Sequence, residues 1–384
     1  MKFAIYSLFL ALASAQCDEN FTIRSQSDAS RLSGCSKFEG QLTIDDVSET
    51  SISLSGLKSI SGSLVIQNNF SLKSISFDSL TSVSDNFQLQ NNTELIGISF
   101  PALTDVDNFQ IIYNPNLKQA SMGVINKVNN YQIIQTSLDQ IAPVSAKIIT
   151  NIEITDNSFL IPIEFPDLVN NTGYINIVNN NPSATVSFPN LMSIRGNATF
   201  RNLDGFEAKN LTTVSNTLNI LGNTFEKISF KNLSTMEKDL SITNNTGLSS
   251  IEIPILKDLG GGLQILSNDK LTEISTNSFT KLEFIKGGVT LEGAFENVVF
   301  PALKRVDGAF KLTTTSSNIT CSAFTTKFKP IVKGTFKCDA AKGSNSGNSS
   351  TADKNNAVSN LTHSYATTLV VAFLSFAIGS KYFI

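Results

Sequence analysis

The sequence has no tryptophan and a single histidine, and both absences limit its chemistry. The histidine, His363, lies beyond the residue at which we expect the chain to be cut, so the mature protein would contain no imidazole. This excludes Ser-His-Asp and Cys-His catalysis and metal sites built on histidine. The lack of tryptophan removes the side chain that most often stacks on sugars.

Net charge and cysteine are also scarce. The formal net charge is −3 and both signs are dispersed, so there is no basic stripe for nucleic acid. The four cysteines are widely spaced and no histidine lies near them, which argues against a metal site. We therefore expect no cofactor, no metal and no nucleic-acid partner.

What the sequence has instead is a repeat of about 22 residues. The clearest copies are SGSLVIQNNFSLKSISFDSLTSV from Ser61 and DNFQLQNNTELIGISFPALTDV from Asp85. Each copy holds an alternating apolar strand, an asparagine pair, a leucine and a second alternating strand. A repeat of this length is typical of solenoids, whose coils bury apolar residues only by stacking on one another.

Taking the first apolar strand residue of each copy gives about thirteen coils, which begin at Leu42, Leu64, Phe87, Phe109, Tyr131, Ile152, Tyr174, Ala198, Leu218, Leu240, Leu263, Val289 and Phe310. Period-two alternation and frequent β-branched residues predict strands rather than helices. The predicted fold is all-β: a right-handed parallel β-helix or leucine-rich-repeat-like solenoid with disulfide-capped ends. A leucine-rich horseshoe is the alternative, but the far side of each copy reads as strand.

An asparagine recurs five residues after most strand starts, at Asn69, Asn92, Asn114, Asn157, Asn179, Asn223, Asn245 and Asn268. We predict that these form a structural ladder, in which each side chain bonds the backbone amides freed by a sharp corner. Phe-Pro pairs close the second strand at Phe100, Phe165, Phe188 and Phe300. We expect these phenylalanines in the core, and proline suits a strand end because it has no amide to donate.

Both ends of the chain carry processing signals. Residues 1–15 read as a secretory signal: Lys2, an apolar run, and the small-residue cleavage site Ala13-Ser14-Ala15. Residues 16–339 form the predicted solenoid, with blurred repeats near 121–147 and 195–209 where two lobes are an alternative. Four cysteines allow three pairings, and their positions suggest Cys17–Cys35 and Cys321–Cys338, one at each end.

The tail predicts a glycosylphosphatidylinositol (GPI) anchor. Residues 340–355 form a disordered Ser/Asn/Gly-rich stalk, and residues 356–384 form a removed propeptide with an apolar end. We choose Asn355 as the attachment residue, with Asn356 and Gly347 as alternatives. A transmembrane anchor is the rival, but the apolar stretch is short and no basic segment follows it.

Sequons run along the whole chain. We predict glycosylation at Asn20, Asn91, Asn170, Asn197, Asn210, Asn232, Asn244, Asn318 and Asn348. Asn69 is doubtful because it falls in the ladder, and Asn360 lies in the removed tail.

Two other functions deserve a test. Parallel β-helices include enzymes that cleave polysaccharides, for which Asp45-Asp46 and Asp105 with Asp107 are the nearest carboxylate pairs. We interpret them as solvated turn residues. Tyr113, Tyr131 and Tyr174 could form a small aromatic binding face, with Tyr113 pointing outward.

Taken together, the signal segment, the repeats, the terminal cysteines, the sequons and the tail resemble the fungal GPI-anchored cell-wall organisation proteins of the extracellular-mutant and sporulation-specific class. The repeat is similar to the receptor L domain of insulin- and EGF-type receptors. The resemblance covers roughly residues 17–384 and brings no catalytic residues.

The resemblance implies a non-enzymatic cell-surface glycoprotein needed for wall organisation and integrity. Its partners would be the outer leaflet of the plasma membrane through the anchor, and wall glucan or mannoprotein through the anchor remnant. The alternatives are a receptor-like ectodomain that binds a peptide or glycan, and a β-helix carbohydrate-active enzyme.

Overall fold

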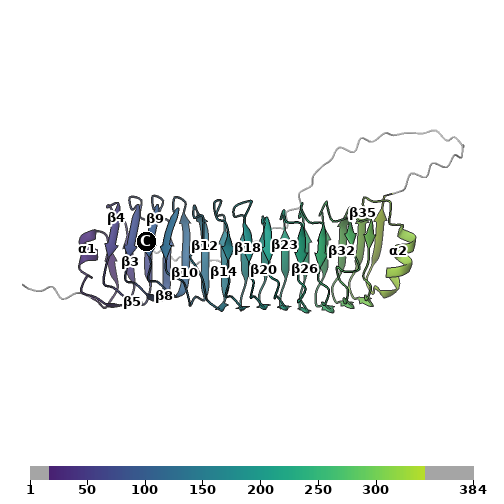
Figure 1. The fold of residues 1–384 in the computed structure, drawn as a ribbon, viewed down its shortest axis with the longest axis horizontal. Coiled ribbons are helices and arrows are strands. Elements are labelled where there is room, and N and C mark those ends of the chain that lie inside the picture. The colour runs from purple at the N-terminus through teal and green to yellow at the C-terminus, as the bar shows by residue number, and fades with distance from the viewer. Residues whose placement is uncertain (1–16, 342–384) are drawn as a thin grey trace, which may run out of the picture. The chain divides into compact units, whose positions relative to one another are not determined.

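The computed structural model describes residues 17–341, which form a parallel β-solenoid of about 15 turns (Figure 1). The predicted signal segment, most of the stalk, the propeptide, Asn348 and the attachment residues Asn355, Asn356 and Gly347 lie outside the described residues. The solenoid has two coils more than the sequence predicted, because β1 and β36 at its two ends also join the main sheet.

The first face of the solenoid is one continuous parallel sheet. It takes one strand from every coil: β1 (Phe21–Ile23), β3 (Leu42–Asp45), β6 (Leu64–Gln67), β8 (Ser82–Gln90), β10 (Asp105–Asn114), β12 (Asn130–Thr136), β14 (Asn151–Thr155), β17 (Ile175–Val178), β20 (Ala198–Arg201), β23 (Leu218–Leu221), β26 (Leu240–Thr243), β29 (Leu263–Leu266), β32 (Val289–Gly293), β35 (Phe310–Thr314) and β36 (Phe336–Ala340). Like residues pair in register, as in Leu42 with Leu64 and Ile44 with Ile66.

The second face is narrower and lies just before the first in each coil. Near the amino end it consists of β2 (Lys37–Glu39) and β5 (Ser59–Ser61), which pair onward with the start of β8. Further along it is an eight-stranded sheet: β13 (Ile148–Ile149), β16 (Asn170–Asn171), β19 (Ser193–Ile194), β22 (Thr213–Val214), β25 (Thr235–Met236), β28 (Asp258–Leu259), β31 (Phe284–Ile285) and β34 (Arg305–Val306).

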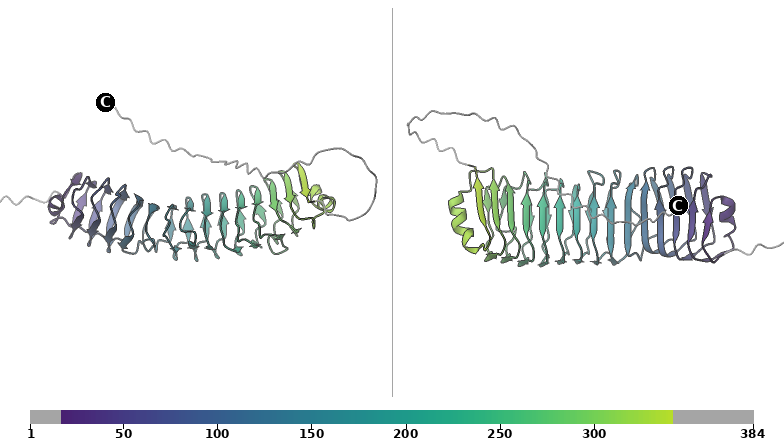
Figure 2. Two further views of the ribbon diagram at one scale, coloured as in Figure 1. Left: turned by 90° about the horizontal axis from the view of Figure 1, so that it is seen from above. Right: turned by 180° about the vertical axis from the view of Figure 1, so that it is seen from behind.

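The third face is strand, as expected for a β-helix rather than a horseshoe, but it is broken into four pieces. They are β4 (Ser51–Leu54), β7 (Ser74–Phe77), β9 (Gly97–Phe100) and β11 (Gln119–Met122); β15 (Ile163–Glu164), β18 (Thr185–Ser187) and β21 (Gly205–Glu207); β24 (Lys227–Ser229) and β27 (Ser250–Glu252); and β30 (Glu273–Ile274) and β33 (Asn297–Val298). Two of the breaks fall at the blurred repeats near 121–147 and 195–209. The stack nonetheless continues through both, because the first face pairs without interruption there (Figure 2).

Stacked side chains fill the interior. Phe87, Phe109 and Tyr131 lie one above another, with ring centroids 5.2 and 5.1 Å apart. Phe100, Phe165, Phe188 and Phe300 are buried, which confirms the core assignment of the Phe-Pro pairs. Parallel in-register pairing places each ring on its neighbour, and stacked aromatic pairs add to the free energy of burial.

The asparagine ladder forms as predicted at all but one position. The Oδ1 atom of Asn69 accepts the backbone amide of Val47 at 3.0 Å, and its Nδ2 donates to Ile44 O at 3.1 Å and to Asn92 Oδ1 at 2.8 Å. The Asn69 side chain therefore joins three successive coils, and Asn92, Asn157, Asn223 and Asn245 do the same. The ladder asparagines are buried, with every polar side-chain atom satisfied.

One register prediction was wrong. Ile152 pairs with Ile175, so the strand starts at Ile175 rather than Tyr174, and the ladder residue is Asn180 rather than Asn179. Because side chains alternate between faces, a shift of one residue turns Tyr174 from the core to the surface.

The first asparagine of each pair has a separate role. The residue before the ladder position adopts positive φ in coil after coil: Asp46, Asn68, Asn91, Tyr113, Gln135, Asp156, Asn179, Asn202, Gly222, Asn244 and Ser267. Asparagine, aspartate and glycine tolerate this left-handed conformation best. In each Asn-Asn pair, the first asparagine thus forms the turn, and the second hydrogen-bonds the backbone N–H and C=O groups that the turn leaves unpaired.

Helices and disulfides close both ends. At the amino end, α1 (Gln26–Ser30) covers the edge strand β4: Gln26 Oε1 accepts Ser53 N, and Gln26 Nε2 donates to Ser53 O, both at 2.9 Å. At the carboxyl end, α2 (Cys321–Phe328) and the short 3₁₀ helix η1 (Lys329–Ile331) place Phe324 against Phe310 and Phe336. The predicted pairings Cys17–Cys35 and Cys321–Cys338 are confirmed. Such caps protect strand edges that would otherwise pair with other chains.

The ladder predicts a large stability effect at Asn245. Its side chain bonds Asn223, Ile220 and Asn268, all buried, so an Asn245→Ala change leaves several buried polar groups unsatisfied. We expect a loss of about 3 kcal/mol or more in the free energy of unfolding, measured by denaturant titration. The control is Asn176→Ala, on the outward side of β17, with an expected change within about 0.5 kcal/mol. If the two changes lowered the free energy of unfolding equally, the ladder would not be a main source of stability.

Candidate functional site

The carboxylates considered for catalysis are engaged as turn and strand residues. Asp45 lies on the outward side of β3 and accepts a hydrogen bond from Gln67 Nε2 at 3.4 Å, while Asp46 turns the corner with positive φ. Asp105 accepts Thr104 Oγ1 at 2.7 Å, and Asp107 lies where the register of β10 shifts against β8. None of these four carboxylates lines a pocket described below.

The three tyrosines do not form one face. Tyr131 is fully buried in the ring stack, which corrects the suggestion of a shared aromatic surface. Tyr113 points outward as predicted, half exposed at its corner. Tyr174 lies on the outer side of the main sheet, where its hydroxyl donates to Glu153 Oε2 at 3.1 Å and Gln132 Nε2 donates to the same oxygen at 3.0 Å.

The most developed hollow lies at the break between β21 and β24, and we call it the β21–β24 recess. Its volume is about 570 Å³, and Phe206, Ala208, Lys209, Lys227 and Lys231 are among its lining residues. The coil that ends there is short: Leu203 and Asn223, at equivalent ladder positions, are 20 residues apart instead of the usual 22 or 23. In this shortened coil β21 pairs with β18 of the preceding coil but not with β24 of the following one.

The floor of the recess differs from that of the two neighbouring coils because an alanine stands where they have a phenylalanine. Strand β21 pairs with β18 in a register that sets Ala208 in the column of Phe188 and Phe230. The missing ring volume is filled by Phe206, whose ring centroid lies 4.3 Å from that of Phe200 and 5.8 Å from that of Phe230. Phe206 is only partly buried, so it presents an aromatic surface to the recess.

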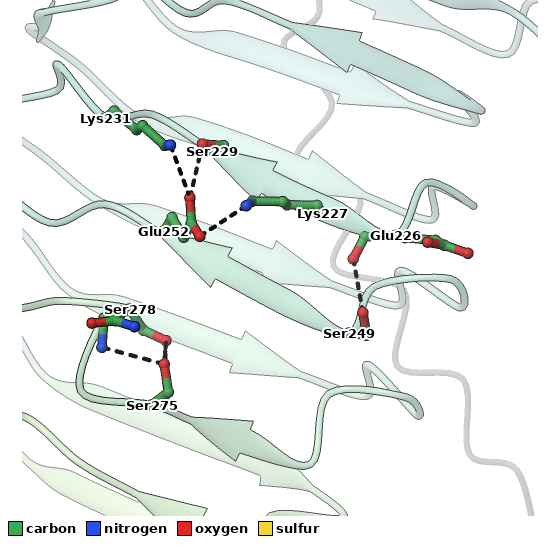
Figure 3. Close-up of polar contacts among 9 residues, drawn as sticks. Glu226, Lys227, Ser229, Lys231, Ser249, Glu252, Ser275 and Ser278 are labelled. Carbon is green, nitrogen blue, oxygen red and sulfur yellow. Dashed lines mark hydrogen bonds and ion pairs between the residues drawn. The ribbon is translucent and has the colours of Figure 1, made fainter.

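Charged side chains line the recess beside this floor, and Figure 3 shows the group around Glu252. Glu252 on β27 lies between Lys227 and Lys231, with nitrogen–oxygen distances of 2.8 and 3.9 Å, and accepts Ser229 Oγ at 3.3 Å. The hydrogen bond from Lys227, with the positive charges of both lysines, lowers the pKa of Glu252. Lys209 lies 3.6 Å from Glu207. Three lysines and two carboxylates leave the recess with a net positive charge.

A second, apolar hollow lies at another break in the third face, the one between β11 and β15. Its volume is about 300 Å³, and its lining includes Val124, Ile141, Pro143 and Pro162. The side chain of Val124 is half exposed. Both hollows therefore coincide with stretches where the repeat was hard to read. The sequence reasoning missed the residues of both; the available signals were the short coil and the alanine in the phenylalanine column.

The described sequons differ in exposure. Asn20, Asn197, Asn232, Asn244 and Asn318 are exposed, and Asn91, Asn170 and Asn210 are half-buried. Asn69 is fully buried and its Nδ2 atom donates two hydrogen bonds, so the folded chain offers no room for a glycan there. Occupancy of the other sequons stays a prediction.

Within residues 17–341, no group of three or more potential ligands is placed to hold a metal ion. The same residues include no helix long and apolar enough to cross a bilayer.

The chain is similar to fungal cell-surface proteins over most of its length. It is 32% identical over 340 residues to a cell surface GPI-anchored protein of Arthroderma benhamiae, covering 88% of this chain and 87% of the relative. It is 34% identical over 349 residues to the protein ecm33 of Aspergillus fumigatus, covering 89% and 86%. The chain belongs to the ecm33 family of cell-surface proteins.

A more distant relative is sporulation-specific protein 22 of Saccharomyces cerevisiae, 28% identical over 200 residues, which cover 51% of this chain and 42% of the relative. No family model and no solved structure matches the chain. The comparisons confirm the family inferred from the repeats, and this ecm33-family member is a cell-surface protein.

The Tyr174–Glu153 contact predicts a measurable titration. Burial and then the Glu153 carboxylate raise the pKa of the Tyr174 phenol to about 12. A Glu153→Gln change should lower that pKa while leaving the part due to burial. Ultraviolet difference titration, with a Tyr174→Phe partner for each protein, isolates this phenol. Glu292→Gln, which changes an exposed carboxylate on the distant strand β32, is the control.

The sign of the stability effect follows from the raised pKa. The folded chain holds the Tyr174 proton more tightly than the unfolded chain. This contribution to stability is therefore complete below about pH 10 and is lost as the pH rises toward about 12. An unchanged Tyr174 pKa in the Glu153→Gln protein would show that the carboxylate is not the neighbour that matters.

Proposed function

We propose that this protein is a non-enzymatic, GPI-anchored glycoprotein that maintains the organisation and integrity of the fungal cell wall. The observation that carries the proposal is the alignment with a cell surface GPI-anchored protein over 87% of its length and with the protein ecm33 over 86% of its length. A continuous solenoid supports a structural role, because its inward side chains pack in stacked columns and the four carboxylates considered for catalysis lie at turns and on strands outside both hollows.

The proposed attachments follow from the tail. We propose that the chain is cut at Asn355 and joined to a GPI anchor, which holds it in the outer leaflet of the plasma membrane. Transfer of the anchor remnant would link it to wall glucan, and its mannoprotein neighbours would be contacted from there. The predicted N-glycans would lie along the solenoid's exposed corners, which keeps bare surfaces of neighbouring copies apart.

A deletion strain tests the wall function. We expect loss of the gene to make cells hypersensitive to wall-perturbing dyes, and the wild-type chain to restore resistance. An Asp105→Asn chain should restore it equally, because no catalytic step depends on that carboxylate. Glucan hydrolysis or transfer by the purified protein, abolished by Asp105→Asn, would overturn the non-enzymatic role.

The anchor needs its own measurement. Phosphatidylinositol-specific phospholipase should release the membrane-bound protein into the soluble fraction, and the released carboxyl-terminal peptide should end at Asn355, or at Asn356 or Gly347. A mature protein that still contains Ile384 would contradict attachment at any of these residues.

A further inference from the structure

The β21–β24 recess has the features of a ligand site rather than of a packing defect. Each of its two walls is the edge strand of its own sheet, β21 on one side and β24 on the other. Edge strands present backbone N–H and C=O groups that no neighbouring strand uses. The hollow thus combines polar backbone groups with an aromatic floor, the mixture typical of small-molecule sites.

The aromatic floor is rigid. Phe206 is held between Phe200 and Phe230, so its ring is fixed without help from a ligand. A fixed ring costs little conformational entropy on binding, and its free face suits the apolar side of a pyranose ring through dispersion contacts. Phe206 supplies here the stacking surface that the missing tryptophans would otherwise provide.

Two asparagines add oriented acceptors at the rim. Asn210 Nδ2 donates to Pro189 O at 2.7 Å, and Asn232 Nδ2 donates to Lys209 O at 3.0 Å. These bonds to the preceding coil orient both amides and leave their Oδ1 atoms without a hydrogen-bond donor among the described residues. Sugar hydroxyls are suitable donors for such oxygens.

The lysines select for negative charge. Lys209 and Lys231 are 64% and 69% exposed, and lie 3.6 and 3.9 Å from their carboxylates. Exposed ion pairs at these distances contribute little and exchange readily for a ligand anion. Phosphate or carboxylate oxygens would receive charge-assisted hydrogen bonds from the ammonium groups.

We propose that the β21–β24 recess binds an anionic saccharide, with a pyranose ring on Phe206 and a phosphate or carboxylate group on Lys209 and Lys231. This binding site does not depend on the wall function proposed above, since it concerns the chemistry of one surface of the chain.

Direct titration tests the proposal. Mannose 6-phosphate, glucuronate, mannose and inorganic phosphate are titrated into the purified protein by calorimetry, before and after enzymatic removal of N-glycans, because Asn210 and Asn232 are predicted sequons at the rim. We expect one of the two anionic sugars to bind more tightly than mannose and phosphate in at least one form, and added salt to weaken it. The preferred anionic sugar distinguishes a phosphate source from a carboxylate source.

Matched variants locate the site. The double change Lys209→Gln and Lys231→Gln should weaken binding about tenfold or more, as expected for lost hydrogen bonds to a charged group. Lys304→Gln, which removes an equally exposed lysine outside the recess, should leave binding unchanged. Phe206→Leu, which keeps an apolar floor, should weaken all pyranose ligands and spare inorganic phosphate.

The experiment distinguishes a loss of binding from a loss of folding. The lysine variants alter exposed side chains, so they should keep the wild-type melting temperature and a binding loss cannot be attributed to misfolding. Absence of binding by either anionic sugar to both glycosylated and deglycosylated protein would overturn the proposal. So would binding that tolerates the Lys209/Lys231 double change but fails in Lys304→Gln.

Discussion

The structure depends on one constraint: every coil must stack on the next in parallel register, about 4.8 Å away. A parallel stack repeats each residue's surroundings, so any polar atom turned inward must find its partner in the neighbouring coil. Asparagine meets this demand because its side chain both donates and accepts. Asn92 accepts from Asn69 and donates to Asn114, so each ladder residue satisfies a neighbour and is satisfied in turn.

Where another residue replaces the ladder asparagine, fewer hydrogen bonds join the neighbouring coils. The Thr136 hydroxyl donates to Asn157 Oδ1 and accepts from Leu138 N, whereas Leu203 contributes only its backbone amide, to Asn223 Oδ1. These two coils adjoin two of the three breaks in the third face, those after β11 and β21. The first face pairs without interruption through both, so the main sheet sets the coil spacing and the third face absorbs differences in coil length. Hollows arise on the face that is free to deviate.

Most of the fold could be predicted because every copy of the repeat shows the same pattern of alternating apolar residues, which stacking of the coils requires. The alternation of apolar residues predicted the strands, and the positions of the cysteines predicted the disulfides at both ends. The errors came where one copy departed from the template. Tyr174 is apolar enough to pass for a strand start, yet its coil is displaced by one residue, which only the pairing of Ile152 with Ile175 reveals. Tyr131 lies in the core, as its place among the strand starts predicted, and so it shares no surface with Tyr113 and Tyr174.

The recess shows why the surface was harder to predict than the core. Repetition carries no information about a feature that occurs once, and Phe206, Ala208 and the three lysines belong to a single irregular coil and its neighbour. They line a recess only because β21 and β24 do not pair, which is a feature of two neighbouring coils rather than of any single residue. In a solenoid, regularity therefore specifies the scaffold, and the capacity to recognise something specific is concentrated where regularity fails.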